Sequence, residues 1–145
     1  MKLHVGWIGK TKEAAIAKLT AEYLKRIGHY IDVQSHEFKS EQAMLEFVER
    51  ERVRPSVVVM DERGVQLSSL DFSKFISRYQ ERGTQALLFV IGPADGFSEN
   101  TRKAADNMLS LGKMILAHEL ARVVLLEQLY RAFTILKGHP YHRGD

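Results

Sequence analysis

The residues best suited to chemistry lie together near the C-terminal end, in the segment His139-Pro140-Tyr141-His142-Arg143. Two imidazoles, a phenol and a guanidinium in so short a stretch can stack on bases and bind phosphates, as RNA recognition requires. The histidines also have a His-x-x-His spacing, but Asp145 is the only further ligand nearby and nothing fixes a coordination geometry. The segment therefore predicts RNA contact and no metal site, with a frayed chain end as the structural alternative.

A second candidate is the loop Gly92-Pro93-Ala94-Asp95-Gly96, which follows the apolar run from Ala86 to Ile91. Glycines in such a loop allow the backbone to approach a ligand closely. The spacing is not the dinucleotide-binding fingerprint, and no Gly-Lys-Ser/Thr follows as in a Walker loop. On its own, the loop is explained equally well as an ordinary turn between a strand and a helix.

Other charged residues have a plain structural explanation beside the functional one. Arg131 follows Glu127 by four positions, which predicts an ion pair worth a few tenths of a kcal/mol on a helix surface. His118 begins the same helical pattern, and Asp61 follows an apolar run, where it can bind a ribose hydroxyl or simply form a turn. The sequence has no cysteine, which excludes disulfides, thiolate metal ligands and a cysteine nucleophile. It also has no Ser-His-Asp arrangement, paired catalytic carboxylates or HExxH pattern.

The elements that must position these residues form a single domain over residues 1–145. Hydrophobic residues make up 45% of the chain and charged residues 27%, so the chain can form a packed core without disulfides or a structural metal. The net charge of +3 is compatible with an RNA phosphate backbone but is only weak support for it. The N-terminus resembles no signal peptide, and no stretch approaches the roughly 20 apolar residues of a membrane span, so we expect a cytoplasmic protein.

Short β-rich runs alternate with helical patterns along the chain. We expect strands over residues 3–9, 31–38, 56–60, 86–91 and 108–111. Helices are expected over residues 12–27, 71–79 and about 118–137. Ser40 is expected to cap a further helix that carries Met44, Leu45 and Val48, and Ser98 to begin a short one. The residues Asp61 to Gly64 are expected to form a turn. Apolar strands alternating with helices predict an α/β fold, a parallel sheet with helices on both faces. Ligands bind such sheets at the carboxyl ends of the strands, which would gather Met60, Gly92 and the stretch after Leu111 into one crevice.

The last helix carries apolar residues on more than one side, and Val123 through Leu126 alone cover most of a turn. A helix of this kind must be buried on several faces. We therefore predict a homodimer, with one face on the sheet and another against a second subunit. The alternative is a central helix within a monomer.

Several segments of this chain resemble one known family. These are Ser110 to Met114, His118, Arg122 to Phe133 and His139 to Arg143. Together they resemble the C-terminal signature of the ribosomal RNA large subunit methyltransferase H family, which belongs to the SPOUT class. The similarity extends to the N-terminal Met-Lys-Leu, to Glu22-Tyr23-Leu24-Lys25-Arg26, to the strand ending at Met60 and to the Gly92 loop, and so covers essentially the whole chain.

The resemblance implies a C-terminal trefoil knot, a homodimer and S-adenosylmethionine (SAM) as the cofactor. It implies methylation of ring nitrogen N3 of a pseudouridine in 23S rRNA of the assembled ribosome. By position, the cofactor contacts fall on Met60, Gly92, Leu111, Gly112, Lys113, Met114, Ile115 and Leu116. One departure is Pro93, which stands where the family usually has a second glycine. Proline removes a backbone N–H and fixes φ, so cofactor affinity would fall if recognition used that donor or a positive φ.

Methyl transfer from a sulfonium requires an in-line nucleophile at short range and the loss of the proton of the base nitrogen. His142 is the first candidate for the proton acceptor and His118 the second, because imidazole titrates near neutral pH. Arg143 is expected to bind phosphate or developing charge, and Tyr141 to stack on a base or hydrogen-bond it. Arg122, Arg131 and His139 are further candidates for RNA contact.

Three other functions remain open at this point. A related SPOUT enzyme would methylate a ribose 2′-hydroxyl with the same fold and cofactor. A ribosome-binding module without cofactor is favoured only by Pro93. A flavodoxin-like small-ligand binder would leave the basic aromatic tail unexplained.

Overall fold

The computed structural model describes the backbone of residues 1–143 and the side chains of residues 1–141. Strands and helices alternate almost throughout the chain. The elements are β1 (Lys2–Ile8), α1 (Ala14–Ile27), β2 (Asp32–Phe38), α2 (Glu41–Arg50), β3 (Ser56–Gln66), α3 (Ser69–Glu81), β4 (Ala86–Ile91), α4 (Glu99–Ala104), β5 (Asn107–Ser110), α5 (His118–Lys137) and the 3₁₀ turn η1 (Pro140–Arg143).

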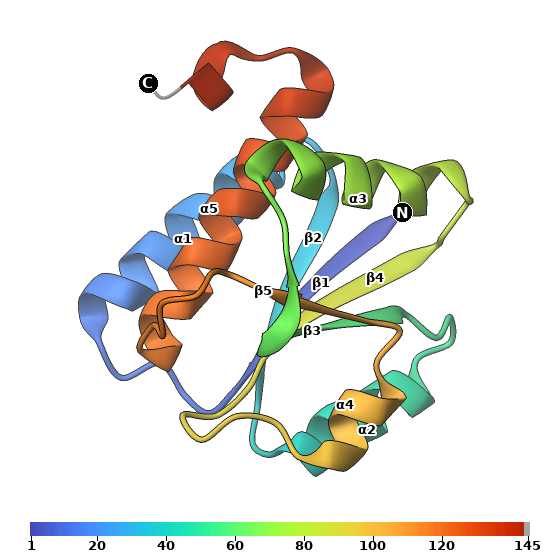
Figure 1. Cartoon of the computed structure of the whole chain (residues 1–145), viewed down its shortest axis with the longest axis vertical. Helices are drawn as coiled ribbons and strands as arrows, with labels where there is room; N and C mark the ends of the chain where they lie inside the picture. Colours follow the sequence, from blue (N-terminus) through green and yellow to red (C-terminus); the bar gives the residue numbers. More distant parts are fainter. Residues whose placement is uncertain (144–145) are drawn as a thin grey trace.

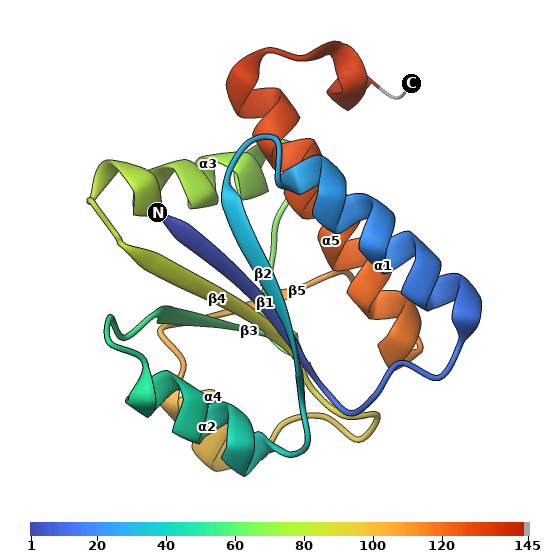
Figure 2. The same ribbon diagram turned by 180° about the vertical axis from the view of Figure 1, so that it is seen from behind.

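The five strands form one parallel sheet in the order β2-β1-β4-β3-β5. Figures 1 and 2 show α1, α3 and α5 on one face of this sheet and α2 with α4 on the other. The α/β architecture predicted from the alternating apolar runs is therefore confirmed. The trefoil knot stays an implication of the family resemblance.

Two apolar clusters hold these layers together, one on each face of the sheet. On the larger side, Leu3 and Phe89 of the central strands pack with Ile76 of α3 and with Leu125 and Leu129 of α5, all of them fully buried. The smaller cluster joins the opposite face of the strands to α2 and to Phe97. All six residues of β4 are buried because helices cover both of its faces.

Helix α5 runs over the residues that its pattern predicted, and it lies beside α1 (Figure 1). It buries Leu125, Leu126 and Leu129 against the sheet, yet Leu120 remains 45% exposed. Part of the apolar surface of this helix is thus exposed. Among the described residues, no helix is both long and apolar enough to cross a membrane.

The sequence prediction was wrong at two places around β3. Asp61 to Gly64 do not form a turn that ends the strand; β3 continues to Gln66 after an irregularity between Met60 and Val65. Both Met60 and Val65 pair with Leu109 of β5, so the residues between them bow out of the ladder. Helix α3 begins earlier than expected, because the Ser68 hydroxyl accepts the backbone N–H of Asp71 and caps the helix there.

Candidate functional site

A cavity of about 340 Å³ opens at the carboxyl ends of β3, β4 and β5. The strand order makes β3 the neighbour of both β4 and β5, which the sequence alone left as an assumption. The expected crevice of Met60, Gly92 and the stretch after Leu111 is therefore a single site. Its lining comprises Met60, Asp61, Glu62, Arg63, Ile91, Gly92, Pro93, Ala94, Asp95, Gly96, Phe97, Arg102, Ser110, Leu111, Gly112, Met114, Ile115, Leu116, His118 and Ala121.

The loop after β4 forms one wall of the cavity. The buried ring of Phe97 packs on Gly92, where a Cβ atom would lie only 3.1 Å from the ring. Gly96 has a positive φ of 85° and donates its N–H to the carbonyl of Pro93, 2.9 Å away. No described residue other than glycine has a positive φ, so Pro93 sits where its ring permits. Pro93 thus offers no backbone donor at this position but introduces no backbone strain.

The segment between β5 and α5 forms the opposite wall. The Ser110 hydroxyl accepts the N–H of Gly112 at 3.2 Å and lies 2.9 Å from the carbonyl of the same glycine, which closes a tight turn. Of the cofactor contacts expected here, five line the cavity and only Lys113 does not. Met114 and Ile115 are 86% and 85% exposed. Two large apolar side chains exposed side by side are uncommon on the surface of a soluble protein.

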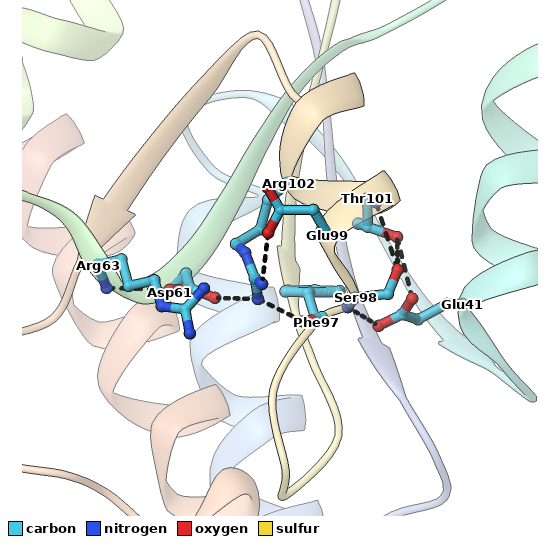
Figure 3. A network of polar contacts seen from close by, with 8 residues as sticks. All are labelled: Glu41, Asp61, Arg63, Phe97, Ser98, Glu99, Thr101 and Arg102. Atoms are coloured by element: carbon cyan, nitrogen blue, oxygen red, sulfur yellow. Dashed lines mark hydrogen bonds and ion pairs between the residues drawn. The ribbon is translucent and has the colours of Figure 1, made fainter.

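A network of polar contacts fixes the third wall, where β3 meets α4 (Figure 3). Arg102 of α4 donates to the Phe97 carbonyl and to Glu99, and it faces Asp61 of β3 at 3.8 Å. Asp61 in turn accepts the backbone N–H of Arg63 at 2.9 Å. The network thereby ties the bowed segment of β3 to the end of the Gly92 loop.

The same network reaches through to α2. The Glu41 carboxylate accepts the backbone N–H of Ser98 at 2.8 Å and the hydroxyl of Thr101 at 3.0 Å (Figure 3). Ser98, where the sequence predicts the start of a short helix, is the N-cap of α4. Because Glu41 holds that cap, α2 helps to set the position of the cavity wall from the opposite face of the sheet.

His118 lines the cavity from the first turn of α5, but Arg122 one turn later does not. The expectation that Arg122 contacts RNA does not fit its position, because the side chain is fully buried. Its guanidinium donates to the Thr11 hydroxyl at 2.9 Å and to the Ile8 carbonyl at 3.3 Å, and it lies over the Trp7 ring. Burial lowers the pKa of Arg122. Its role in this fold is to hold the turn after β1 against α5.

The C-terminal tail packs against the second half of α5 rather than beside the cavity. The Tyr141 hydroxyl donates to Glu127 at 2.8 Å, and its ring lies against Tyr130 and under the guanidinium of Arg131. Burial, followed by the hydrogen bond to Glu127, raises the pKa of Tyr141. The predicted ion pair between Glu127 and Arg131 is confirmed at 2.6 Å.

Two further tail residues belong to the expected catalytic set. The side chains of His142 and Arg143 lie outside the described residues, so their positions stay predictions. His139 is exposed, and its ring nitrogen Nδ1 accepts the backbone N–H of Tyr141 at 3.2 Å. Among the described residues, no group of histidine, aspartate and glutamate side chains is arranged to hold a metal ion.

Sequence reasoning missed part of the cavity lining. At Asp61 the sequence is compatible with a ribose ligand or a turn residue and does not decide between them, and Phe97 and Arg102 carry no recognisable signal. Arg102 sits in a short exposed-looking helix, and only the pairing of β3 with β4 and β5 brings it to the cavity. Nothing in the local sequence could have indicated this.

Comparison with known proteins places this geometry in a family. Residues 1–142 match the family described as "Predicted SPOUT methyltransferase". The chain is 54% identical over 145 residues to the ribosomal RNA large subunit methyltransferase H of Koribacter versatilis, with 99% of both chains covered. It belongs to the ribosomal RNA large subunit methyltransferase H family. The member of this family from Geotalea daltonii is 40% identical over 152 residues, covering 98% of this chain and 99% of that one.

Other solved structures have a fold similar to that of this SPOUT protein. The SpoU methyltransferase AviRb from Streptomyces viridochromogenes superimposes with a TM-score of 0.57 at 18% identity, covering 94% of this chain and 60% of that one. A probable methylase family protein from Haemophilus influenzae gives a TM-score of 0.61 at 14% identity, covering 95% and 69%. At such low identity the likeness supports the shared architecture alone.

Proposed function

We propose that this protein transfers a methyl group from SAM to N3 of a pseudouridine in 23S rRNA, on the assembled ribosome and therefore in the cytoplasm. The observation that carries the proposal is the cavity at the ends of β3, β4 and β5, in a chain 54% identical to a ribosomal RNA large subunit methyltransferase H. A structure of AviRb in complex with the cofactor AdoMet, at a TM-score of 0.55 and 19% identity, supports the choice of cofactor.

The cavity suits a ligand of this kind in size and chemistry. Its volume of about 340 Å³ falls in the range of roughly 300–1,000 Å³ of small-molecule sites. Met60, Ile91 and Leu116 offer apolar surface to a purine ring, while the loops at Gly92 and Gly112 bring backbone groups to its edges. The bound cofactor supplies a methyl group activated by a positively charged sulfur.

The protein must orient the acceptor and remove one proton. The N3 nitrogen attacks the methyl carbon, the bond from carbon to sulfur breaks, and the proton of N3 leaves for a base. His142 of the tail is the proposed proton acceptor, because imidazole titrates near neutral pH. His118, which lines the cavity, is the second candidate.

The tail and the cavity of one protomer are far apart. The tail packs around Tyr130 and Arg131, which lie about 18 Å along the helix axis from His118. We therefore propose a homodimer in which Tyr141, His142 and Arg143 of one subunit serve the cavity of the other. The exposed apolar side chains of Met114, Ile115 and Leu120 beside the cavity support a protein surface there.

The direct test is nucleoside mass spectrometry of 23S rRNA after ribosomes lacking the modification are incubated with the protein and SAM. The expected product is a pseudouridine heavier by one methyl group on the base. Methylation of a ribose instead would move the protein to the related 2′-O class, and no incorporation despite SAM binding would refute the proposal. Isolated 23S rRNA is the control that tests the requirement for the assembled ribosome.

Shared sites can be tested by mixing two inactive variants. One variant lacks residues 139–145, and the other carries Leu116→Trp, which fills the cavity of its own subunit. We expect the first to bind SAM without methylating ribosomes and the second not to bind SAM. Mixed dimers that recover activity would support a tail acting on the partner's cavity, whereas unchanged activity of the truncated protein would refute the role of the tail.

A further inference from the structure

Asp61 is a carboxylate on the wall of the cavity, at the bowed segment of β3. Its side chain is only 7% exposed, whereas the other acidic residues of the lining, Glu62 and Asp95, are exposed. A carboxylate can accept about four hydrogen bonds. In the described structure Asp61 accepts one, from the backbone N–H of Arg63. A buried polar group with open acceptor positions beside a cavity indicates a ligand that donates.

Arg102 balances the charge of Asp61 without occupying these acceptor positions. Its nitrogen Nη1 lies 3.8 Å from the Asp61 oxygen Oδ2, beyond hydrogen-bond distance. The guanidinium is committed instead to the Phe97 carbonyl and to Glu99, as Figure 3 shows. The arginine therefore fixes the carboxylate and the end of the Gly92 loop relative to each other, while leaving the carboxylate open to the cavity.

SAM has two kinds of donor that could bind Asp61, an ammonium and the ribose hydroxyls, and the neighbouring Arg102 favours one of them. The ammonium of its amino-acid part carries a positive charge, which the Arg102 guanidinium beside Asp61 would repel. The ribose diol is neutral and offers two adjacent O–H donors, which match the two oxygens of one carboxylate. Hydrogen bonds from neutral donors to a carboxylate are among the stronger ones in proteins. The diol is thus the group that fits.

We propose that Asp61 accepts both ribose hydroxyls of the cofactor and that Arg102 is the positioning residue that holds it in place. The inference rests on the proposed function, because it assumes that the nucleoside of SAM enters this cavity. It makes Asp61 the residue that distinguishes a ribose cofactor from its deoxy counterpart.

This contact can be tested by binding alone, by removing the ribose hydroxyls from the ligand and the Asp61 carboxylate from the protein, separately and together. Calorimetry would compare S-adenosylhomocysteine with its 2′,3′-dideoxy analogue, on the wild-type protein and on Asp61→Asn. We expect loss of the hydroxyls to weaken binding about 30-fold in the wild type and less than about 3-fold in Asp61→Asn. Glu62→Gln is the matched control, since it removes an exposed carboxylate from the same wall and should keep the full preference.

The outcomes separate this inference from the function on which it rests. A wild-type protein that binds neither ligand nor SAM would refute the proposed cofactor site itself. Binding of both ligands with equal affinity, or a preference that survives in Asp61→Asn, would overturn the role of Asp61 alone. Should Asp61→Asn fail to fold, Asp61→Glu displaces the carboxylate by one methylene and should also reduce the preference. If Asp61→Glu keeps the full preference for the ligand with ribose hydroxyls, the proposal is overturned. It is also overturned if Asp61→Asn weakens only the binding of ligands that carry the amino group.

Discussion

Gly64 offers a test of how the cavity is built, because it lies where the bowed segment of β3 returns to β5. A Cβ atom at this position would lie 2.6 Å from backbone atoms of Met108 and Leu109. Ordinary contact begins at 3.4 Å, so Gly64→Ala must push the two strands apart by about 0.8 Å. The obstructing atoms are main chain and cannot rotate away. The strands that would separate carry Asp61 on one side and lead to Leu111 on the other.

Overpacking of this kind costs about 1–3 kcal/mol. For a domain of this size, a loss of 2 kcal/mol lowers Tm by about 4–8 °C. We expect Gly64→Ala to show that shift in thermal unfolding and to bind SAM at least about 10-fold more weakly by calorimetry. Gly28→Ala is the control, because Gly28 has an ordinary helical φ of −59°. Its added Cβ would lie 3.3 Å from the Leu24 and Lys25 carbonyls, against 2.6 Å at Gly64, so Tm and affinity should change much less. Wild-type Tm and affinity in Gly64→Ala would refute the close approach of β3 and β5.

Three further predictions concern other parts of the fold. Burial and the neighbouring His4 lower the pKa of His36 to about 4, so the unfolded chain binds the proton first. Stability is therefore full above about pH 6.5 and should fall by about 3 kcal/mol toward pH 4, a slope that His36→Gln should flatten in urea unfolding. Arg122→Met should increase hydrogen exchange at Thr11 and its neighbours, because the turn after β1 loses its donors; unchanged protection would contradict this role. Tyr141→Phe removes the hydrogen bond to Glu127 and should make the tail more sensitive to limited proteolysis, and equal cleavage rates would show that other contacts hold it.

The cavity shows where local sequence information ended. Met60, Gly92 and Leu111 to Leu116 were expected at the site because apolar strands and the loops after them are visible in the sequence, and because the chain resembles a known family. At Asp61 the sequence predicts a turn, since Asp-Glu-Arg-Gly after an apolar run is typical of one. Only the second pairing of β3 with β5, at Val65 and Gln66, keeps this segment in the sheet.

Arg122 shows the same limit for a charged side chain. In the sequence, Arg122 is an arginine on a helix of a basic protein, which favours contact with RNA. In the fold, α5 turns it toward the end of β1, where the Ile8 carbonyl and the Thr11 hydroxyl meet its guanidinium. Those partners are more than a hundred residues away in the chain, so no local pattern could reveal them.

The sequence by itself determined the elements and their order, because hydrophobic periodicity and N-caps such as Ser40 and Ser98 act over a few residues. It also identified the family, since the tail and the final helix carry side chains at distinctive positions. The tertiary structure decided which strand ends become neighbours, how Arg102 comes to face Asp61, and that Tyr141 of the tail lies against α5 rather than at the cavity. These outcomes depend on contacts between distant segments, which form only when the whole sheet and its covering helices pack together.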